Sequence, residues 1–255
     1  MFARAHVAAR DGAICVTQTF ESLKPPKRFY LGVDVAATDD GFAVRLDGRN
    51  ARTPAGRALA VPTAALARLV ADEWQTQADV IAMATMPATR LAHTAIDNVA
   101  GQEAAFAALV AECAAHDSIC YLADGPQALV ERQQAAWRPL LGWARQELAL
   151  DFETTAGVVH RDQPAATLAA VKTMALARGA FALAGIVLAA QTFGSAILAL
   201  ALMHGRVDGP QAAAAALLDE LFQAEQWGED DEAEARRRAI EAEAAMLQHW
   251  FAALR

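Results

Sequence analysis

The chain has 255 residues, of which 55% are hydrophobic, and a formal net charge of −8 at pH 7. A chain of this length and apolar content supplies a sizeable core for one large domain or two small ones. The acidic balance argues against nucleic-acid binding, because phosphate contacts need a basic face, and it favours a protein partner.

The first 26 residues lack the continuous apolar run and the small-residue cleavage site of a secretory signal. We interpret 1–26 as a flexible extension that ends at Pro25–Pro26, with a weakly amphipathic organellar presequence as the alternative. The chain contains three cysteines and no CxxC pair, which favours a reducing compartment.

The segment from Lys27 to Val61 carries the sustained strand patterns of the chain. Apolar and β-branched residues in KRFYLGVDV precede an alternating stretch, FAVRLDGRNART, whose Asp47–Gly48 pair is typical of a tight hairpin. A helix then begins at Thr63, which is suited to cap it. The sequence therefore predicts a small antiparallel sheet followed by a helix.

Helical patterns prevail in the rest of the chain. We expect helices over 104–122, 129–150, 165–178, 180–204, 208–226 and 230–253. Pro139 should bend the helix over 129–150 or start a new one. The uncharged run 179–203 is long enough to cross a membrane. Polar and small residues near Thr192–Gly194 instead favour two consecutive core helices and no membrane insertion. The prediction is an α+β, mostly α fold, with a small α+β domain over 27–98 and a larger helical domain over 99–255.

Two patterns that carry chemistry in enzymes are weak or missing here. Neither GxxxxGK[ST] nor GxGxxG occurs, which argues against an ATPase or a dinucleotide-dependent enzyme. On a continuous helix, Cys113, His116 and Cys120 would share one face as possible metal ligands. Because no second Cys/His cluster completes a tetrahedral site, buried structural residues are the favoured interpretation.

Eight carboxylates crowd the stretch DELFQAEQWGEDDEAEARRR near the C-terminus. Gly228 is placed to end one helix, and several of the acids that follow lie in the first turn of the next, where they oppose the helix dipole. The pairs Glu232–Arg236 and Glu234–Arg238 have the favourable i to i+4 order. Most of the acidic residues are thus explained by helix stability.

A smaller group around the turn is left over and is called the acidic turn: Glu220, Gln223, Trp227, Glu229 and Asp230. Exposed polar groups beside an aromatic anchor are typical of a protein-binding surface. The alternative is a metal-dependent hydrolase that uses Glu220, Glu229 and Asp230, or the face formed by the two cysteines and the histidine.

Seven motifs follow one another from about Lys27 to Arg255. In chain order they are KRFY, VRLDGRNARTPAG, VPTAALARLVADEWQTQ, MPATRLAHTAID, HDSICY, GSAILALAL and DELFQAEQWGEDDEA. Each motif is weak alone, but their joint order resembles the assembly chaperones of the ATP synthase catalytic head, of the ATP-twelve type.

The resemblance implies a chaperone and not an enzyme, with no cofactor and no metal. Such a protein binds the unassembled α subunit of the F-type ATP synthase head, without using ATP, until β subunits replace it. The family's fold is a small α+β domain followed by an orthogonal helical bundle. Its members occur in mitochondria and alphaproteobacteria, so we expect a cytoplasmic bacterial protein, or a matrix protein if the source is eukaryotic.

The resemblance also carries family motif positions onto this chain. Besides the acidic turn, they are Trp74 in DEW and Arg90 and Asp97 in TRLAHTAID. An aromatic side chain under a helix and an internal ion pair would serve folding alone, so these three residues are interpreted as structural or partner-binding.

Overall fold

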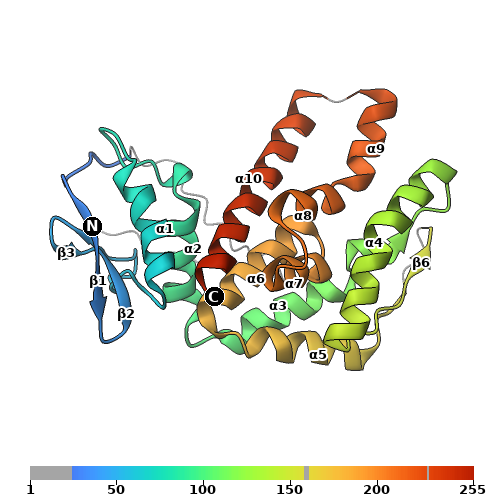
Figure 1. The fold of residues 1–255 in the computed structure, drawn as a ribbon, viewed down its shortest axis with the longest axis horizontal. Coiled ribbons are helices and arrows are strands. Elements are labelled where there is room, and N and C mark those ends of the chain that lie inside the picture. Colours follow the sequence, from blue (N-terminus) through green and yellow to red (C-terminus); the bar gives the residue numbers. More distant parts are fainter. Residues whose placement is uncertain (1–24, 158–160, 229) are drawn as a thin grey trace.

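The computed structural model describes residues 25–157, 161–228 and 230–255. A small sheet with two helices lies at one end of an elongated molecule, and a larger array of helices forms the rest (Figure 1). This architecture confirms the predicted α+β, mostly α fold. The expected extension 1–26 lies outside the described residues, apart from its last two positions.

The sheet is built around its second strand. Its members are β1 (Val33–Thr38), β2 (Gly41–Leu46), β3 (Arg49–Asn50) and β4 (Ala60–Val61). Strand β2 pairs antiparallel with each of the other three. Asp47 and Gly48 join β2 to β3 with φ angles of 48° and 76°, and two positive angles are typical of a type I′ hairpin turn. The predicted hairpin is confirmed.

Helices α1 (Ala64–Gln75) and α2 (Pro87–Thr94) connect the sheet to the rest of the molecule. Thr63 caps α1 as expected, because its hydroxyl oxygen accepts from the Leu66 backbone N–H at 3.1 Å. A short 3-10 helix (Met83–Thr85) precedes α2, and a π-helical turn (Ala95–Val99) continues it. Helix α2 contacts α1 on one side and α6 and α10 on the other, so it joins the two parts.

The helical part contains eight further helices among the described residues, a 3-10 turn and a two-stranded parallel pair. In chain order these elements are α3 (Glu103–Ala115), the 3-10 turn Ser118–Cys120, β5 (Tyr121–Leu122), α4 (Gln127–Leu148), β6 (Thr155–Ala156), α5 (Ala165–Leu176), α6 (Gly179–Phe193), α7 (Ala196–His204), α8 (Gly209–Ala216), α9 (Leu218–Trp227) and α10 (Asp231–Ala253).

Three helix boundaries differ from those expected. Helix α3 ends at Ala115 and not near 122, because Asp117 turns the chain and binds another helix. The segment expected as one helix over 208–226 is divided at Leu217 into α8 and α9. Helix α4 runs on through Pro139, where a bend or a new start was expected.

The long uncharged run forms two core helices, as predicted. Helix α6 ends at Gly194, whose φ of 64° suits a residue without a side chain. Ser195 then caps α7 by accepting from the Leu198 backbone N–H at 3.0 Å. Among the helices of the described chain, none combines the length and apolar composition that crossing a bilayer requires.

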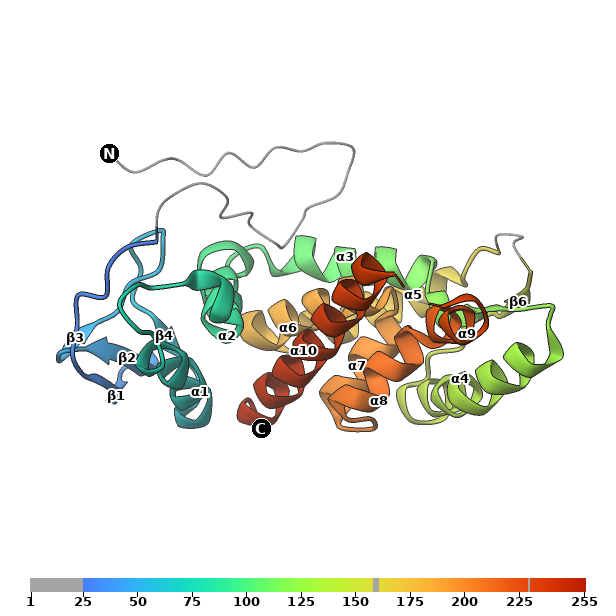
Figure 2. The same ribbon diagram turned by 90° about the horizontal axis from the view of Figure 1, so that it is seen from above.

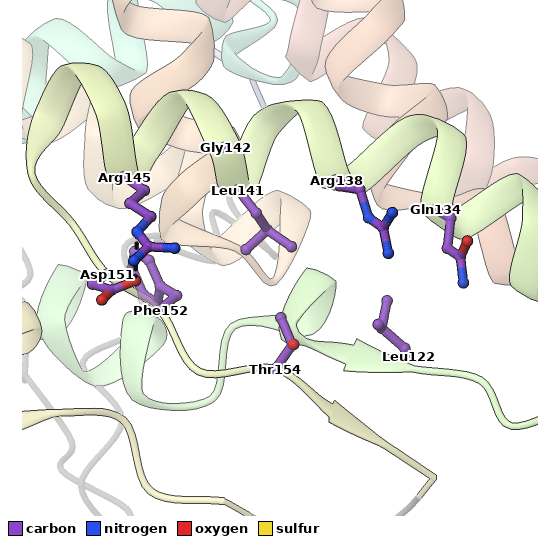
Figure 3. Close-up of a pocket in the computed structure, with 9 residues that line it drawn as sticks. All are labelled: Leu122, Gln134, Arg138, Leu141, Gly142, Arg145, Asp151, Phe152 and Thr154. Carbon is purple, nitrogen blue, oxygen red and sulfur yellow. Dashed lines mark ion pairs between the residues drawn. The ribbon is translucent and has the colours of Figure 1, made fainter.

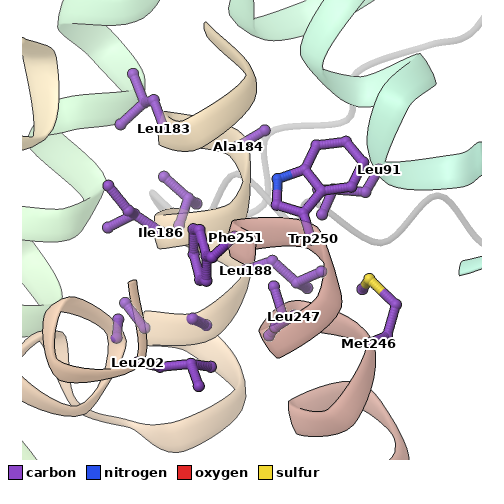
Figure 4. Close-up of a cluster of buried hydrophobic side chains, with 14 of the residues drawn as sticks. Leu91, Leu183, Ala184, Ile186, Leu188, Leu202, Met246, Leu247, Trp250 and Phe251 are labelled. Atoms are coloured by element: carbon purple, nitrogen blue, oxygen red, sulfur yellow. The ribbon is translucent and has the colours of Figure 1, made fainter. Parts of the chain in front are cut away.

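The centre of the helical part lies where α10 crosses α6 (Figures 2 and 4). Trp250 of α10 is fully buried, and its indole N–H donates to the Phe181 carbonyl at 3.1 Å. Gly185 permits this close approach, because a Cβ there would lie only 2.8 Å from the Phe251 ring. The C-terminal half of α10 is therefore anchored in the core, while its N-terminal half extends away from the body (Figure 1).

Candidate protein-binding site

Helix α9 and the first half of α10 form a helical hairpin, residues 218–243, that we call the α9–α10 arm. It protrudes from the helical part (Figure 1), with Trp227 at the end of α9 and Asp230 at the start of α10 beside its tip and Glu220 near the base of α9. Helix α9 is amphipathic: Phe222 is buried, Leu218 and Leu221 are half-buried, and Gln223 is exposed. The apolar side of α9 therefore faces the protein and its polar side faces outward.

One ion pair ties the two helices of the arm together. Arg236 of α10 donates from Nη1 to both carboxylate oxygens of Glu220 in α9, at 2.6 Å each. This contact corrects the expectation that Arg236 pairs with Glu232 within its own helix. The expected pair between Glu234 and Arg238 is confirmed. Glu220 thus has a structural partner that lies 16 positions away in the sequence.

A second set of contacts ties α9 to α4. Arg132 of α4 lies 2.8 Å from Glu225, and its guanidinium is 5.2 Å from the centre of the Phe222 ring. The hydrogen bond from Arg132 holds the pKa of the Glu225 carboxyl below its usual range. Gln133 donates to Asp219 at 2.7 Å. Helix α9 is therefore held from both sides.

The outward face of α9 carries three residues of the acidic turn at helical spacing, namely Glu220, Gln223 and Trp227. Trp227 is 80% exposed, the largest exposure of any aromatic side chain in the described chain. Asp230 caps α10 by accepting from the Ala233 backbone N–H at 2.7 Å, and Glu229 lies outside the described residues. A fixed helix thus presents an exposed indole with a polar surround.

Trp74 and Asp97 both make contacts inside the protein. Trp74 is 7% exposed and packs edge-on against Tyr30, whose hydroxyl donates to the Trp74 carbonyl at 2.7 Å. Asp97 accepts from the Thr53 hydroxyl at 2.7 Å and from the Ala55 backbone N–H at 3.1 Å. The two hydrogen bonds of Asp97 attach the loop after β3 to the π-helical turn. The contacts of both residues fit their structural interpretation.

Arg90 and His93 lie on α2 between the two parts of the molecule. Both are half-buried. The Nε atom of Arg90 and both ring nitrogens of His93 are buried without a hydrogen-bond partner among the described residues. Burial lowers the pKa of His93 to about 4, against the opposing effect of Asp97. His93 is therefore neutral at pH 7.

Cys113, His116 and Cys120 do not share a helix face, which corrects the expectation from their spacing. Cys113 lies in α3, His116 follows the end of that helix, and Cys120 belongs to the 3-10 turn. Burial raises the pKa of Cys113 to about 12, and its thiol donates to the Ala190 carbonyl at 3.2 Å. Within the ranges that the structure describes, no three His, Cys, Asp or Glu side chains are grouped as metal ligands.

Asp117 explains why α3 ends where it does. Its carboxylate is fully buried and accepts from the backbone N–H of Ile197 at 3.0 Å, in the first turn of α7, and from that of Ile119 at 3.4 Å. Burial raises the pKa of Asp117 to about 6, although hydrogen bonds to the carboxylate oppose the rise. Nothing in the sequence indicated that Asp117 binds the start of α7.

The sequence pattern did not single out Glu73, which holds the start of α2, or Arg132, which holds α9. Glu73 accepts from the backbone N–H groups of Ala88 and Thr89 at 2.8 and 2.7 Å, and so caps α2 from the neighbouring helix. Burial raises the pKa of Glu73. Neither Met86 nor Pro87 at the start of α2 has a side chain that can cap the helix. This missing cap could have predicted that a residue from another element caps α2.

An exposed indole on a helix that is held from both sides is typical of a protein-binding surface. A family model described as ATP12 chaperone protein matches residues 27–145. The crystal structure of Atp12 from Paracoccus denitrificans is 38% identical and has a TM-score of 0.85, with 90% of this chain and 99% of that chain covered. The chain belongs to the ATP12 chaperone family, as the order of its motifs indicated.

Two further solved structures support this assignment. A mutant of Atp12p from P. denitrificans is 37% identical, with a TM-score of 0.85 and with 90% of this chain and 98% of that chain covered. The Atu1473 protein from Agrobacterium tumefaciens, a putative chaperone by its description, is 41% identical, with a TM-score of 0.84 and with 90% and 87% covered, respectively. These matches confirm the fold over nearly the whole described chain.

Proposed function

We propose that this protein is an assembly chaperone for the F-type ATP synthase, which binds the unassembled α subunit through the tip of the α9–α10 arm. It keeps α from aggregating, without using ATP, until β subunits replace it. The observation that carries the proposal is the exposed face of Glu220, Gln223 and Trp227 on a helix held from both sides. Its place of action is the cytoplasm, or the mitochondrial matrix in a eukaryote.

The bracing of α9 supports a role in binding. Holding a contact surface in its bound shape lowers the entropy lost on association. Arg236 holds α9 to α10 and Arg132 holds it to α4, so the indole of Trp227 is presented on a fixed support. A large aromatic side chain with a polar surround is the usual composition of an energetic centre in a protein interface.

The polar character of the tip suits a chaperone that must also leave. An unassembled subunit exposes apolar surface that its neighbours later bury, and such surface aggregates unless it is covered. A partly polar interface of moderate size dissociates more readily than a large apolar one. The tip has one exposed indole among carboxylates and amides, so β subunits can displace the chaperone.

The test is co-expression of the ATP synthase α subunit with this chain, followed by measurement of soluble α and size-exclusion chromatography. We expect more soluble α and a complex of the two proteins. Trp227→Ala should weaken binding at least about tenfold, or roughly 1.4 kcal/mol. Leu176→Ala, at another exposed apolar side chain, is the matched control and should bind normally. No complex with the unaltered chain would refute the proposed function.

A further inference from the structure

A groove separates α4 from the segment that carries β5 and β6 (Figure 3). One stripe of α4 forms its upper wall, with Gln134, Arg138, Leu141 and Arg145 at helical spacing. Side chains from β5 and from the link before β6 form the opposite wall. The other side of α4 is buried in the bundle through Trp137 and Leu140, so the groove stripe is the free face of the helix.

The groove combines apolar side chains with two arginines of α4. Leu141 lies midway along it, Phe152 lies beside Asp151 and Leu122 lies below Arg138 (Figure 3), and all three apolar side chains are only partly buried. At one end, Arg145 forms an ion pair with Asp151 at 3.3 Å. At the other end, the side chains of Arg138 and Gln134 point from α4 toward Leu122 (Figure 3).

Arg138 differs from Arg145 because it has no hydrogen bond or ion pair with any described residue. A guanidinium binds a carboxylate through two parallel N–H donors, and this geometry is among the strongest polar contacts in proteins. An unpaired guanidinium beside partly exposed apolar side chains is therefore complementary to a carboxylate that has an apolar neighbour.

The size of the groove limits what it can hold. Its volume is about 260 Å³, which is slightly below the range of roughly 300–1,000 Å³ typical of pockets for cofactors and drug-sized ligands. A space of this volume fits one or two side chains of a protein segment that lies along α4.

We propose that this groove is a second contact for the protein that the chaperone binds, its client. The groove binds a segment of the client in which an acidic side chain adjoins an apolar one. The acidic side chain pairs with Arg138, and the apolar side chain packs on Leu141 and Phe152. The groove and the α9–α10 arm flank α4 in the same half of the molecule (Figures 1 and 2), so one client can reach both. The inference rests on the proposed function, because the client is the α subunit.

The first experiment measures the affinity of the full chain for the α subunit. Arg138→Glu should weaken binding at least fivefold. Arg68→Glu is the matched control, because Arg68 is also an exposed arginine on a helix, lies in α1 far along the chain, and gives the same change in charge. It should bind within twofold of the unaltered chain.

A second pair of variants tests the apolar part of the groove. A Cβ at Gly142 would meet no other atom within 4 Å, so a side chain there extends into the open groove. Gly142→Phe should fill the groove and weaken binding of α at least fivefold, whereas Ala65→Phe, at an exposed position of α1, should leave binding unchanged. Circular dichroism and thermal unfolding of each variant establish that it is folded.

A third experiment separates the groove from the proposed function by using peptides in place of α. The labelled full chain is titrated, with detection by nuclear magnetic resonance, with a capped Leu-Glu-Leu peptide and with its Leu-Gln-Leu counterpart. We expect the acidic peptide alone to shift the backbone signals of Gly142, Phe152 and Thr154, and Arg138→Glu to abolish the shifts.

The outcomes are distinguishable. If α binds Arg138→Glu as tightly as the unaltered chain, or if both peptides act alike, the groove proposal is overturned while the proposed function stands. If acetate at the same concentration reproduces the shifts, the site binds small anions and the proposal of a protein segment is wrong. If α does not bind the unaltered chain at all, the proposed function itself fails.

Discussion

Arg236 of α10 forms its ion pair with Glu220 of α9, across the arm, and not with a carboxylate of its own helix. Both side chains are about half exposed, and such surface pairs contribute roughly 0.2–1 kcal/mol to stability. The pair therefore matters more for the position of α9 than for the overall stability of the protein.

Glu220→Gln tests this role of the pair. We expect a shift in the unfolding midpoint of no more than a few degrees, since the pair is exposed. Hydrogen exchange should become faster in α9, and affinity for the α subunit should fall several-fold because the tip is less ordered. Glu234→Gln removes the Glu234–Arg238 pair within α10. It should change neither hydrogen exchange in α9 nor affinity for the α subunit. Equal effects of the two substitutions would show that the arm is not braced by Arg236.

Gly185→Ala should destabilise the crossing of α6 and α10. The added Cβ would lie 2.8 Å from a ring carbon of Phe251 and 3.0 Å from Trp250, and both aromatic residues are buried in the core. Overpacking of this kind typically costs about 1–3 kcal/mol. Chemical denaturation measures the change.

Gly142→Ala is the matched control for that experiment, because Gly142 also lies inside a helix but has open space around it. The same substitution there should stabilise the protein by up to about 1 kcal/mol, since alanine favours the helix. If Gly185→Ala stabilises the protein to the same extent, the two helices have room to separate and the close packing is not required.

His93 should make the stability of the protein depend on pH in the acidic range. Its pKa is about 4 in the folded protein and about 6.5 in the unfolded chain. As the pH falls below 6.5 the unfolded chain binds a proton and the folded protein does not, so stability is lost until the pH reaches about 4. Between pH 7 and pH 5 this loss amounts to about 2 kcal/mol.

His93→Leu removes the titrating group and should abolish the loss of stability that His93 causes between pH 7 and pH 5. At pH 7 the variant should be about as stable as the unaltered chain, because two buried ring nitrogens without partners among the described residues are replaced by an apolar side chain. Urea denaturation at pH 7 and pH 5 gives the comparison. An unchanged pH dependence in His93→Leu would mean that His93 is protonated in the folded protein at pH 5.

Asp117→Ala should loosen the start of α7. The backbone N–H of Ile197 would lose its partner at 3.0 Å in a fully buried place. Leaving a buried donor unsatisfied costs about 1–3 kcal/mol. Hydrogen exchange at Ile197 and chemical denaturation report the loss. Asp124→Ala, at an exposed aspartate seven positions later, should have little effect, and a similar loss there would contradict the assignment.

The sequence by itself determined the features that depend on a few neighbouring residues. Asp47–Gly48 predicted the β2–β3 hairpin, because positive φ angles are accessible to few residue types. Thr63 marked the start of α1, and the polar interruption around Gly194 divided the long apolar run into α6 and α7. The family followed from the order of such local motifs along the chain.

Only the tertiary structure decided which partners distant residues choose. The spacing of Cys113, His116 and Cys120 suggested one helix face, but Asp117 binds the start of α7, 80 positions away, and the helix ends before it. Arg236 had Glu232 within reach in its own helix and pairs instead with Glu220. Local backbone preferences act over a few residues, whereas these contacts exist only after the helices have packed against one another.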